Sequence, residues 1–275
     1  MNQYIPKPYI IEEIVDFTED VKLFKIKSNL NPKPGQFIEV SIPGYGECPL
    51  ASCSNDENYI HMLTRNVGNL TTMMFKLKKG DKIFIRGPYG KGFPIKNLKN
   101  KNILLIAGGT GIAPVTSLLH YIEKHRNDFK EVYAYFGFRN ERYILLKDKI
   151  KDWQKKFKIV ICLDKKENNE CELKCEIGFI HDVMDKIKPL IDNTIAVLCG
   201  PEIMMDCVTE KLKKQGMKEN RIFWSLERRM ECGFGNCNRC LIQDLYVCKD
   251  GPVFRYDIIK TRIDNEEYSN KIKTN

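Results

Sequence analysis

Residues 103–114 read ILLIAGGTGIAP, and this stretch decides most of the fold. The continuous apolar run from Ile103 to Ala107 is typical of a parallel strand buried on both faces. Pro114 suits the first turn of a following helix, where its missing N–H costs nothing. A strand, a glycine turn and a helix start together form a phosphate cradle. The residues predicted to bind a nucleotide here are Gly108, Gly109, Thr110, Gly111 and Pro114.

The chain after this stretch continues to alternate between strand and helix patterns. Strands are predicted at residues 131–136, 158–163, 194–199 and 221–225, and helices at 143–156, 181–188 and 201–214. Such alternation predicts a parallel sheet with helices on both faces. Ligands bind such sheets beyond the carboxyl ends of the strands, where the sequence places Arg139 and Asp164.

Residues 1–97 predict a different unit, a small antiparallel barrel. Short segments rich in Ile, Val, Phe and Tyr, separated by turn formers, occur at 9–17, 21–27, 36–42, 59–65 and 82–86. A short helix is predicted at 70–77 from the spacing of Leu70, Met74 and Leu77. The backbone amides at its start, near Leu70 and Thr71, are suited to a pyrophosphate, and Arg65 adds a cationic donor fork.

Four cysteines near the end of the chain form the strongest chemical motif: Cys232, Cys237, Cys240 and Cys248. Their spacing, C-x4-C-x2-C and a fourth cysteine after seven more residues, is that of a plant-type [2Fe–2S] cluster. One alternative is a structural zinc site, although such sites usually combine two well-separated cysteine pairs. The other alternative is four unligated thiols.

These motifs, in this order, resemble the ferredoxin-reductase superfamily. Residues 226–240 (LERRMECGFGNCNRC) and 246–254 (YVCKDGPVF) are similar to one branch of it. That branch contains the B subunit of anaerobic sulfite reductase and the gamma subunit of archaeal sulfhydrogenase, with the electron-transfer subunit of dihydroorotate dehydrogenase as a more distant relative. The resemblance covers nearly the whole chain. One departure is Asn238-Arg239, where these relatives often have Gly-His.

The resemblance implies where the cofactors bind. FAD is expected on the barrel, although Cys48 replaces the family's usual arginine. The implied FAD contacts are Pro49, Leu50, Ala51, Ser52, Thr64, Arg65, Gly68, Leu70 and Thr71. The nicotinamide is expected at the run C-G-P-x-x-M, formed by Cys199, Gly200, Pro201 and Met204, with Cys199 as the candidate catalytic residue. Cys199 could instead be a buried structural thiol. Arg139 or Arg142 would select NADPH, whereas the Asp164 carboxylate favours NADH.

The expected fold is therefore a β-barrel plus an α/β unit. An antiparallel FAD-binding barrel (1–97) precedes a parallel-sheet NAD(P)-binding domain (98–225) and a small C-terminal iron–sulfur module (226–275). The expected function is oxidation of NAD(P)H through FAD and delivery of single electrons, through a [2Fe–2S] cluster, to a partner catalytic subunit. By resemblance alone, the short span between Cys240 and Cys248 favours the sulfite reductase form of the family as the partner. The alternatives are the gamma (diaphorase) subunit of a cytoplasmic hydrogenase, a zinc-stabilised flavoprotein binding module, and a free-standing flavin reductase.

Composition excludes other classes of protein. The net charge of +9 over 275 residues comes from lysines spread along the chain, so nucleic-acid binding is not expected. No apolar run approaches the roughly 18 residues of a membrane span, and the N-terminus does not resemble a signal peptide. A cytoplasmic location with reduced thiols follows as an expectation. The charged tail after Ile259 is expected to be frayed.

Overall fold

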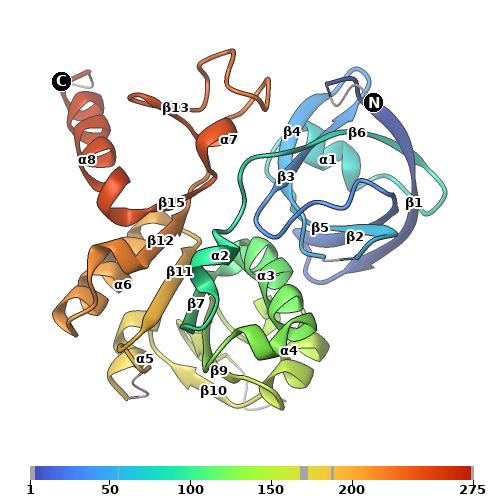
Figure 1. Cartoon of the computed structure of the whole chain (residues 1–275). Helices are drawn as coiled ribbons and strands as arrows, with labels where there is room; N and C mark the ends of the chain where they lie inside the picture. Colours follow the sequence, from blue (N-terminus) through green and yellow to red (C-terminus); the bar gives the residue numbers. More distant parts are fainter. Residues whose placement is uncertain (1–3, 55, 168–172, 187–188, 274–275) are drawn as a thin grey trace.

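The computed structural model describes residues 4–54, 56–167, 173–186 and 189–273. Two large sheets account for most of the described chain, and a small cysteine-bearing module follows them (Figure 1). The two sheets lie side by side, so a ligand can contact both.

The first sheet is a barrel, as the sequence predicts. Its strands are β1 (Lys7–Asp16), β2 (Val21–Lys27), β3 (Phe37–Ile42), β4 (Gly46–Ala51), β5 (Tyr59–Arg65) and β6 (Lys82–Tyr89), all antiparallel, in the order β4-β3-β6-β1-β2-β5. A bridge between Ser52 and Met62 joins the two edge strands. The interior is filled by fully buried apolar side chains such as Phe24, Ile38 and Ile60. Helix α1 (Asn69–Met74) adds Leu70 and Met74 to this core.

The second sheet has the order β10-β9-β8-β7-β11-β12-β15. Its parallel strands are β7 (Asn102–Gly108), β8 (Val132–Phe138), β9 (Lys158–Leu163), β10 (Cys175–Ile177), β11 (Thr194–Cys199) and β12 (Ile222–Ser225). Helices α3 (Ile112–Lys124) and α4 (Lys147–Gln154) pack on one face, and α5 (Ile180–Lys186) and α6 (Glu202–Lys214) on the other. Strand β7 is apolar from Ile103 to Ala107 because both of its faces are buried. Leu105 packs in the core on the side of α3 and α4, and Leu104 packs in the core on the side of α5 and α6. Thus the predicted architecture is confirmed.

Short elements connect these layers. They are α2 (Ile95–Leu98), η1 (Gly109–Gly111), η2 (Arg126–Asp128), η3 (Glu141–Tyr143) and η4 (Glu219–Arg221). The cysteine-bearing module contains the hairpin β13 (Leu241–Ile242) and β14 (Leu245–Tyr246), helix α7 (Val247–Asp250), strand β15 (Val253–Arg255) and helix α8 (Tyr256–Lys273). Strand β15 pairs antiparallel with β12 of the second sheet. Residues after 226 therefore share a sheet with the nucleotide-binding unit, which the sequence did not predict.

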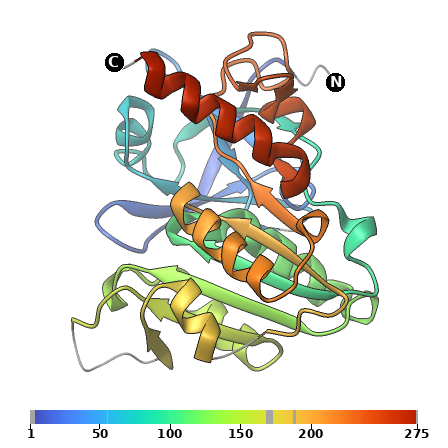
Figure 2. The same cartoon turned by 90° about the vertical axis from the view of Figure 1, so that its left-hand side faces the viewer.

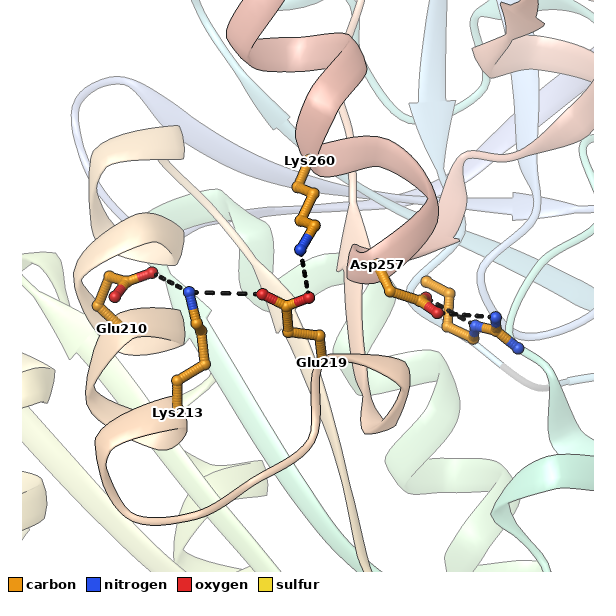
Figure 3. Close-up of polar contacts among 6 residues, drawn as sticks. Glu210, Lys213, Glu219, Asp257 and Lys260 are labelled. Carbon is orange, nitrogen blue, oxygen red and sulfur yellow. Dashed lines mark hydrogen bonds and ion pairs between the residues drawn. The ribbon is translucent and has the colours of Figure 1, made fainter.

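The prediction of a frayed tail after Ile259 was wrong, because helix α8 runs on to Lys273 (Figure 2). Ile259 and Ile263 are buried against the second core. Ion pairs also hold the helix: Glu219 lies 2.5 Å from Lys260 and 3.4 Å from Lys213 (Figure 3). Burial of two apolar side chains, with a carboxylate shared by two cations, outweighs the charged composition of the tail.

Candidate functional site

A cavity of about 550 Å³ opens at the carboxyl ends of β7, β8, β9 and β11. Its wall is completed by the barrel, through Thr18, Asp20, Val21 and Arg65. Five predicted residues of the nucleotide-binding unit also line it: Gly108, Gly109, Thr110, Pro201 and Met204. The position matches the expectation for an open parallel sheet, and the shared wall brings the two large units together at one site.

Gly108 and Gly200 are closely packed, Gly108 against the Met204 and Pro201 side chains and Gly200 against the backbone of Gly108. A β-carbon on Gly108 would lie 2.6 Å from the Met204 sulfur, and one on Gly200 would lie 2.9 Å from the Gly108 nitrogen. Gly200 also has φ +150°, a conformation that L side chains rarely adopt. Gly109, by contrast, has nothing within 4 Å of its β-carbon position. The turn is therefore tightly packed behind and open at Gly109, as a cradle for a phosphate must be.

Cys199 is 1% exposed and does not line the cavity. Burial raises the pKa of its thiol to about 12, so the sulfur stays protonated at neutral pH. Its backbone carbonyl packs against Gly111, and Pro114 is buried in the first turn of α3. In this geometry Cys199 and Pro114 support the turn from behind.

Arg139 and Asp164 lie together at the far side of the cavity and both line it. The Asp164 amide donates to the Phe138 carbonyl at 3.1 Å, and the Arg139 guanidinium lies 5.2 Å from the centre of the Tyr143 ring. Burial raises the pKa of the Asp164 carboxyl, an effect that nearby Arg139 opposes. Arg142 does not line the cavity. Of the two arginines predicted as candidates for a 2′-phosphate contact, Arg139 therefore lines the cavity and Arg142 does not.

On the barrel side, Arg65 faces the cavity and pairs with Asp20, with 2.8 Å between Nε and Oδ2. The neighbouring Thr64 is 1% exposed, and its Oγ1 has no hydrogen-bond partner among the described residues. An unpaired buried hydroxyl destabilises a fold unless a ligand or water completes it. Thr64 shares the strand face of Ile60 and Met62, which fill the barrel interior, and it does not line the cavity. Arg65, on the opposite face of β5, is therefore the residue of this pair that can contact an anionic cofactor in the cavity.

The start of α1, where the sequence predicts a pyrophosphate contact near Leu70 and Thr71, has a cap of its own. The Thr71 hydroxyl accepts hydrogen bonds from the amides of Val67 and Gly68, at 3.0 and 2.9 Å. Those two amides are already paired, and Leu70 and Thr71 are buried. The backbone at Gly68 is therefore fixed by its own helix cap, and only amides further along α1 are open to a pyrophosphate.

The implied FAD contacts on β4 lie at the barrel edge. Pro49, Leu50 and Ala51 are half-buried, so their exposed surface is open to a flat ring. Ser52 is buried, and its hydroxyl accepts a bond from the Ser54 amide at 3.3 Å. Ser52 thus stabilises the turn that closes the barrel.

The four predicted cysteine ligands lie together, as two pairs. The sulfurs of Cys240 and Cys248 are 3.2 Å apart, and the Cys237 thiol donates to the Cys232 sulfur. Backbone amides also point at these sulfurs: Gly235 N lies 3.1 Å from Cys248 Sγ and Asn236 N lies 3.3 Å from Cys232 Sγ. Burial opposes ionisation of Cys232, but the backbone amides of Asn236, Phe234 and Cys237 lower the pKa of its thiol to about 6. Amide donors of this kind stabilise metal-bound thiolates.

Within the described ranges, no group of three or more His, Cys, Asp or Glu side chains gathers around one point as a single metal ion requires. The four sulfurs form two pairs instead, Cys232 with Cys237 and Cys240 with Cys248. The half-buried pair, Cys232 and Cys237, lies toward the surface, while Cys240 and Cys248 are buried.

Sequence reasoning missed several cavity residues. Cys162, Cys207, Phe179 and Ile203 line the cavity, and Ile203 is 72% exposed. Cys207 lies about one helical turn after Met204 on α6, so it is on the same face of the helix as a predicted site residue. This spacing is the sequence signal that could have identified it. Phe179 follows β10, a strand too short to produce a recognisable pattern.

Two family models match this chain. Residues 105–210 match the family model of the oxidoreductase NAD-binding domain, and residues 227–260 match the iron–sulfur cluster binding domain of dihydroorotate dehydrogenase B. Sulfhydrogenase 2 subunit gamma of Pyrococcus furiosus is 36% identical, over 95% of this chain and 99% of its own. A probable dihydroorotate dehydrogenase B electron-transfer subunit from the same organism is 36% identical, over 89% of this chain and 88% of its own.

Solved structures share the fold. The NADH-dependent reduced ferredoxin–NADP oxidoreductase, studied for flavin-based electron bifurcation, superposes with a TM-score of 0.75 at 26% identity, covering 96% of this chain and 95% of that one. A ferredoxin–NADP reductase from Neisseria gonorrhoeae has a TM-score of 0.67 at 18% identity over 80% of this chain and 97% of that one. Among the described residues, none of the helices has the length and apolar character to cross a bilayer.

One chain thus contains an NAD-binding sheet, a barrel that contributes Arg65 to the shared cavity, and a loop with paired cysteines. Its relatives match it along nearly its whole length. The chain belongs to the ferredoxin-reductase superfamily of NAD-dependent flavin and iron–sulfur oxidoreductases, in the branch that includes sulfhydrogenase gamma subunits and dihydroorotate dehydrogenase B electron-transfer subunits.

Proposed function

We propose that this chain oxidises NADH and passes the electrons, through FAD and a [2Fe–2S] cluster, to a separate catalytic subunit. One observation carries the proposal: a single cavity is walled by both the barrel and the sheet, and the cysteine loop packs on the same barrel. A bound flavin would accept the two electrons of a hydride and release them singly, and a bound cluster would carry one electron at a time.

The chain's own residues have positioning roles in this proposal. The open backbone at Gly109 and Thr110 holds the dinucleotide phosphates, and Met204 with Pro201 forms the wall behind the nicotinamide. Arg65 holds the flavin pyrophosphate side. Cys199, the predicted catalytic residue, acts through its backbone, because its thiol is buried and protonated. No protein acid or base is needed for a direct hydride transfer.

Several finer assignments belong to this proposal. The arrangement of the four sulfurs as two pairs supports a two-iron cluster over one tetrahedral zinc. The Asp164 carboxylate in the cavity supports NADH, since it can accept from a ribose hydroxyl and repels a 2′-phosphate.

The partner follows from the relatives. Sulfhydrogenase gamma subunits match this chain along nearly their full length, which supports a hydrogenase-type catalytic subunit. An anaerobic sulfite reductase partner, favoured by the seven residues between Cys240 and Cys248, is the alternative. The described ranges fill two sheets and one small module, so the terminal reaction is assigned to another chain.

Anaerobic purification tests the proposal. We expect about two irons, two acid-labile sulfides and one FAD per chain. NADH should bleach the visible spectrum at a much lower concentration than NADPH does. Cys237→Ser should lose the iron, whereas Cys175→Ser, a half-buried cysteine on β10, should keep it. Zinc without labile sulfide would support the binding-module alternative and overturn the proposal. Co-purification from the native cell identifies the partner.

A further inference from the structure

The proposed electron route requires a fixed distance between the barrel and the cysteine loop, because electron transfer slows steeply as the gap widens. We propose that Arg86, held by Glu47, is the positioning residue that fixes the cysteine loop on the barrel. This inference rests on the proposed function and goes beyond it by assigning a role to the strand segment 86–91, which is part of neither cofactor site.

Arg86 is an unusual barrel residue because it is 7% exposed and carries a charge. It lies on β6, whose other face fills the barrel interior with Ile83 and Ile85. Its Nε and Nη2 donate to the two carboxylate oxygens of Glu47 on β4, at 2.8 and 2.5 Å. This two-point pairing neutralises the guanidinium and fixes its plane.

The remaining donors of Arg86 reach across to the cysteine loop. Nη2 donates to the Glu231 carbonyl at 2.7 Å and Nη1 donates to the Cys232 carbonyl at 2.5 Å. These partners are 145 and 146 residues away in sequence. Charge-assisted hydrogen bonds of this kind are roughly twice as strong as neutral ones. One buried guanidinium therefore ties the backbone of the first predicted ligand to the barrel.

The rest of the segment packs against the same module. A β-carbon on Gly233 would lie 2.9 Å from the Tyr89 ring, and the Tyr89 hydroxyl accepts from Arg86 at 3.0 Å. Lys91 N donates to the Gly251 carbonyl at 2.7 Å, just beyond the fourth cysteine. The segment thus contacts the chain just before Gly233 and just after Cys248, so both ends of the cysteine run are fixed to one strand.

The test compares Arg86→Gln, Arg86→Lys and Glu47→Gln with a matched control, Arg126→Gln. Arg126 also donates to a backbone carbonyl, that of Phe129 at 2.7 Å, but it lies in η2. The first measurement is hydrogen exchange of the amides in residues 232–236, in cofactor-free and in loaded protein. The second is anaerobic stopped-flow with NADH, which follows flavin bleaching and cluster reduction separately. The third is the midpoint potential and resonance spectrum of the cluster.

We expect Arg86→Gln to speed loop exchange and to slow cluster reduction each by about tenfold, while flavin bleaching stays within about twofold. Arg86→Lys should recover part of the loss, because it keeps the charge and loses the fork, and Arg126→Gln should change nothing. Equal loop exchange in Arg86→Gln and the control would overturn the inference. So would an equal fall of both rates, since Arg86 would then support the barrel in general.

If Arg86→Gln does not fold, Arg86→Lys and Glu47→Gln are compared with Arg126→Gln by the same measurements, and their results decide whether Arg86 positions the cysteine loop. Its failure is distinguishable from failure of the proposed function. Zinc, or absence of flavin, in the unsubstituted protein would refute the function, and loop exchange in the cofactor-free protein would still decide the role of Arg86. Unchanged loop exchange with an intact cluster would refute Arg86 alone.

Discussion

Gly111 lies so close to Cys199 that a β-carbon on the glycine would be 2.5 Å from the Cys199 carbonyl oxygen. The neighbouring atom is backbone, in a strand buried at the centre of the sheet, so it cannot move away cheaply. This contact explains why the nucleotide turn needs a glycine at a position where φ is unremarkable.

Gly111→Ala should therefore destabilise the fold by about 1–3 kcal/mol, because the turn and the end of β11 must separate. Thermal unfolding of the cofactor-free protein measures it. Gly68→Ala is the matched control, since nothing lies within 4 Å of its β-carbon position and its φ of −165° suits any residue. Equal midpoints for the two variants would contradict the packing argument.

The pairing of Arg65 with Asp20 should affect how tightly the chain retains an anionic cofactor. The Asp20 carboxylate, 2.8 Å from Arg65, offsets the positive charge that the cavity presents to a pyrophosphate. We expect Arg65→Gln to weaken FAD retention by about tenfold or more, because a charge-assisted partner is lost. Asp20→Asn should strengthen retention, since it leaves the guanidinium unopposed.

Flavin fluorescence during titration at low and high salt measures both changes. Lys78→Gln serves as a charge-matched control, because Lys78 is exposed and does not line the cavity. If Arg65→Gln and Asp20→Asn shifted retention in the same direction, the pair would have a structural role and no part in binding.

We expect the free energy of unfolding to depend on pH through Glu39. It is fully buried on β3, and neither carboxylate oxygen has a hydrogen-bond partner among the described residues. Burial raises the pKa of Glu39 from 4.5 to about 8, although Arg86 opposes the shift. The folded chain therefore keeps this proton up to about pH 8, whereas the unfolded chain releases it near pH 4.5.

Ionisation of Glu39 thus favours the unfolded state between these two pH values. Its contribution to stability is fully present below about pH 4.5 and falls as the pH rises toward about 8. Glu39→Gln should flatten this decline in urea unfolding, and exposed Glu57→Gln should leave it unchanged. Parallel pH profiles for Glu39→Gln and the unsubstituted protein would exclude the assignment.

The sequence predicts those parts of the fold and site that depend on local patterns. The apolar run at 103–107 predicts β7, the glycines after it predict the turn, and the spacing of Cys232, Cys237 and Cys240 predicts three thiols on one short loop. Each signal lies within a dozen residues, and local geometry converts it directly into structure.

Other features depend on contacts between distant segments, which no local pattern contains. Strand β15 has three residues and joins the sheet through the edge of β12. Arg86 meets its carbonyl partners across 145 residues or more. Helix α8 did carry a local signal, Ile259 and Ile263 four residues apart, but the surrounding charges masked it.

The last prediction concerns Cys199 and Cys207, which lie before and after Pro201 and Met204 in the chain. Cys207 is half-buried and lines the cavity, whereas Cys199 is 1% exposed with the pKa of its thiol raised by burial to about 12. Because the thiolate is the reactive form, iodoacetamide at about pH 8 should modify Cys207 and spare Cys199. Bound NADH should slow the modification of Cys207 and leave half-buried Cys175 on β10 unaffected. Peptide mass spectrometry after timed quenching separates the three sites. Modification of Cys199 as fast as Cys207 would show that its thiol reaches the cavity, and a reactive role for that sulfur would then replace the supporting one assigned to it.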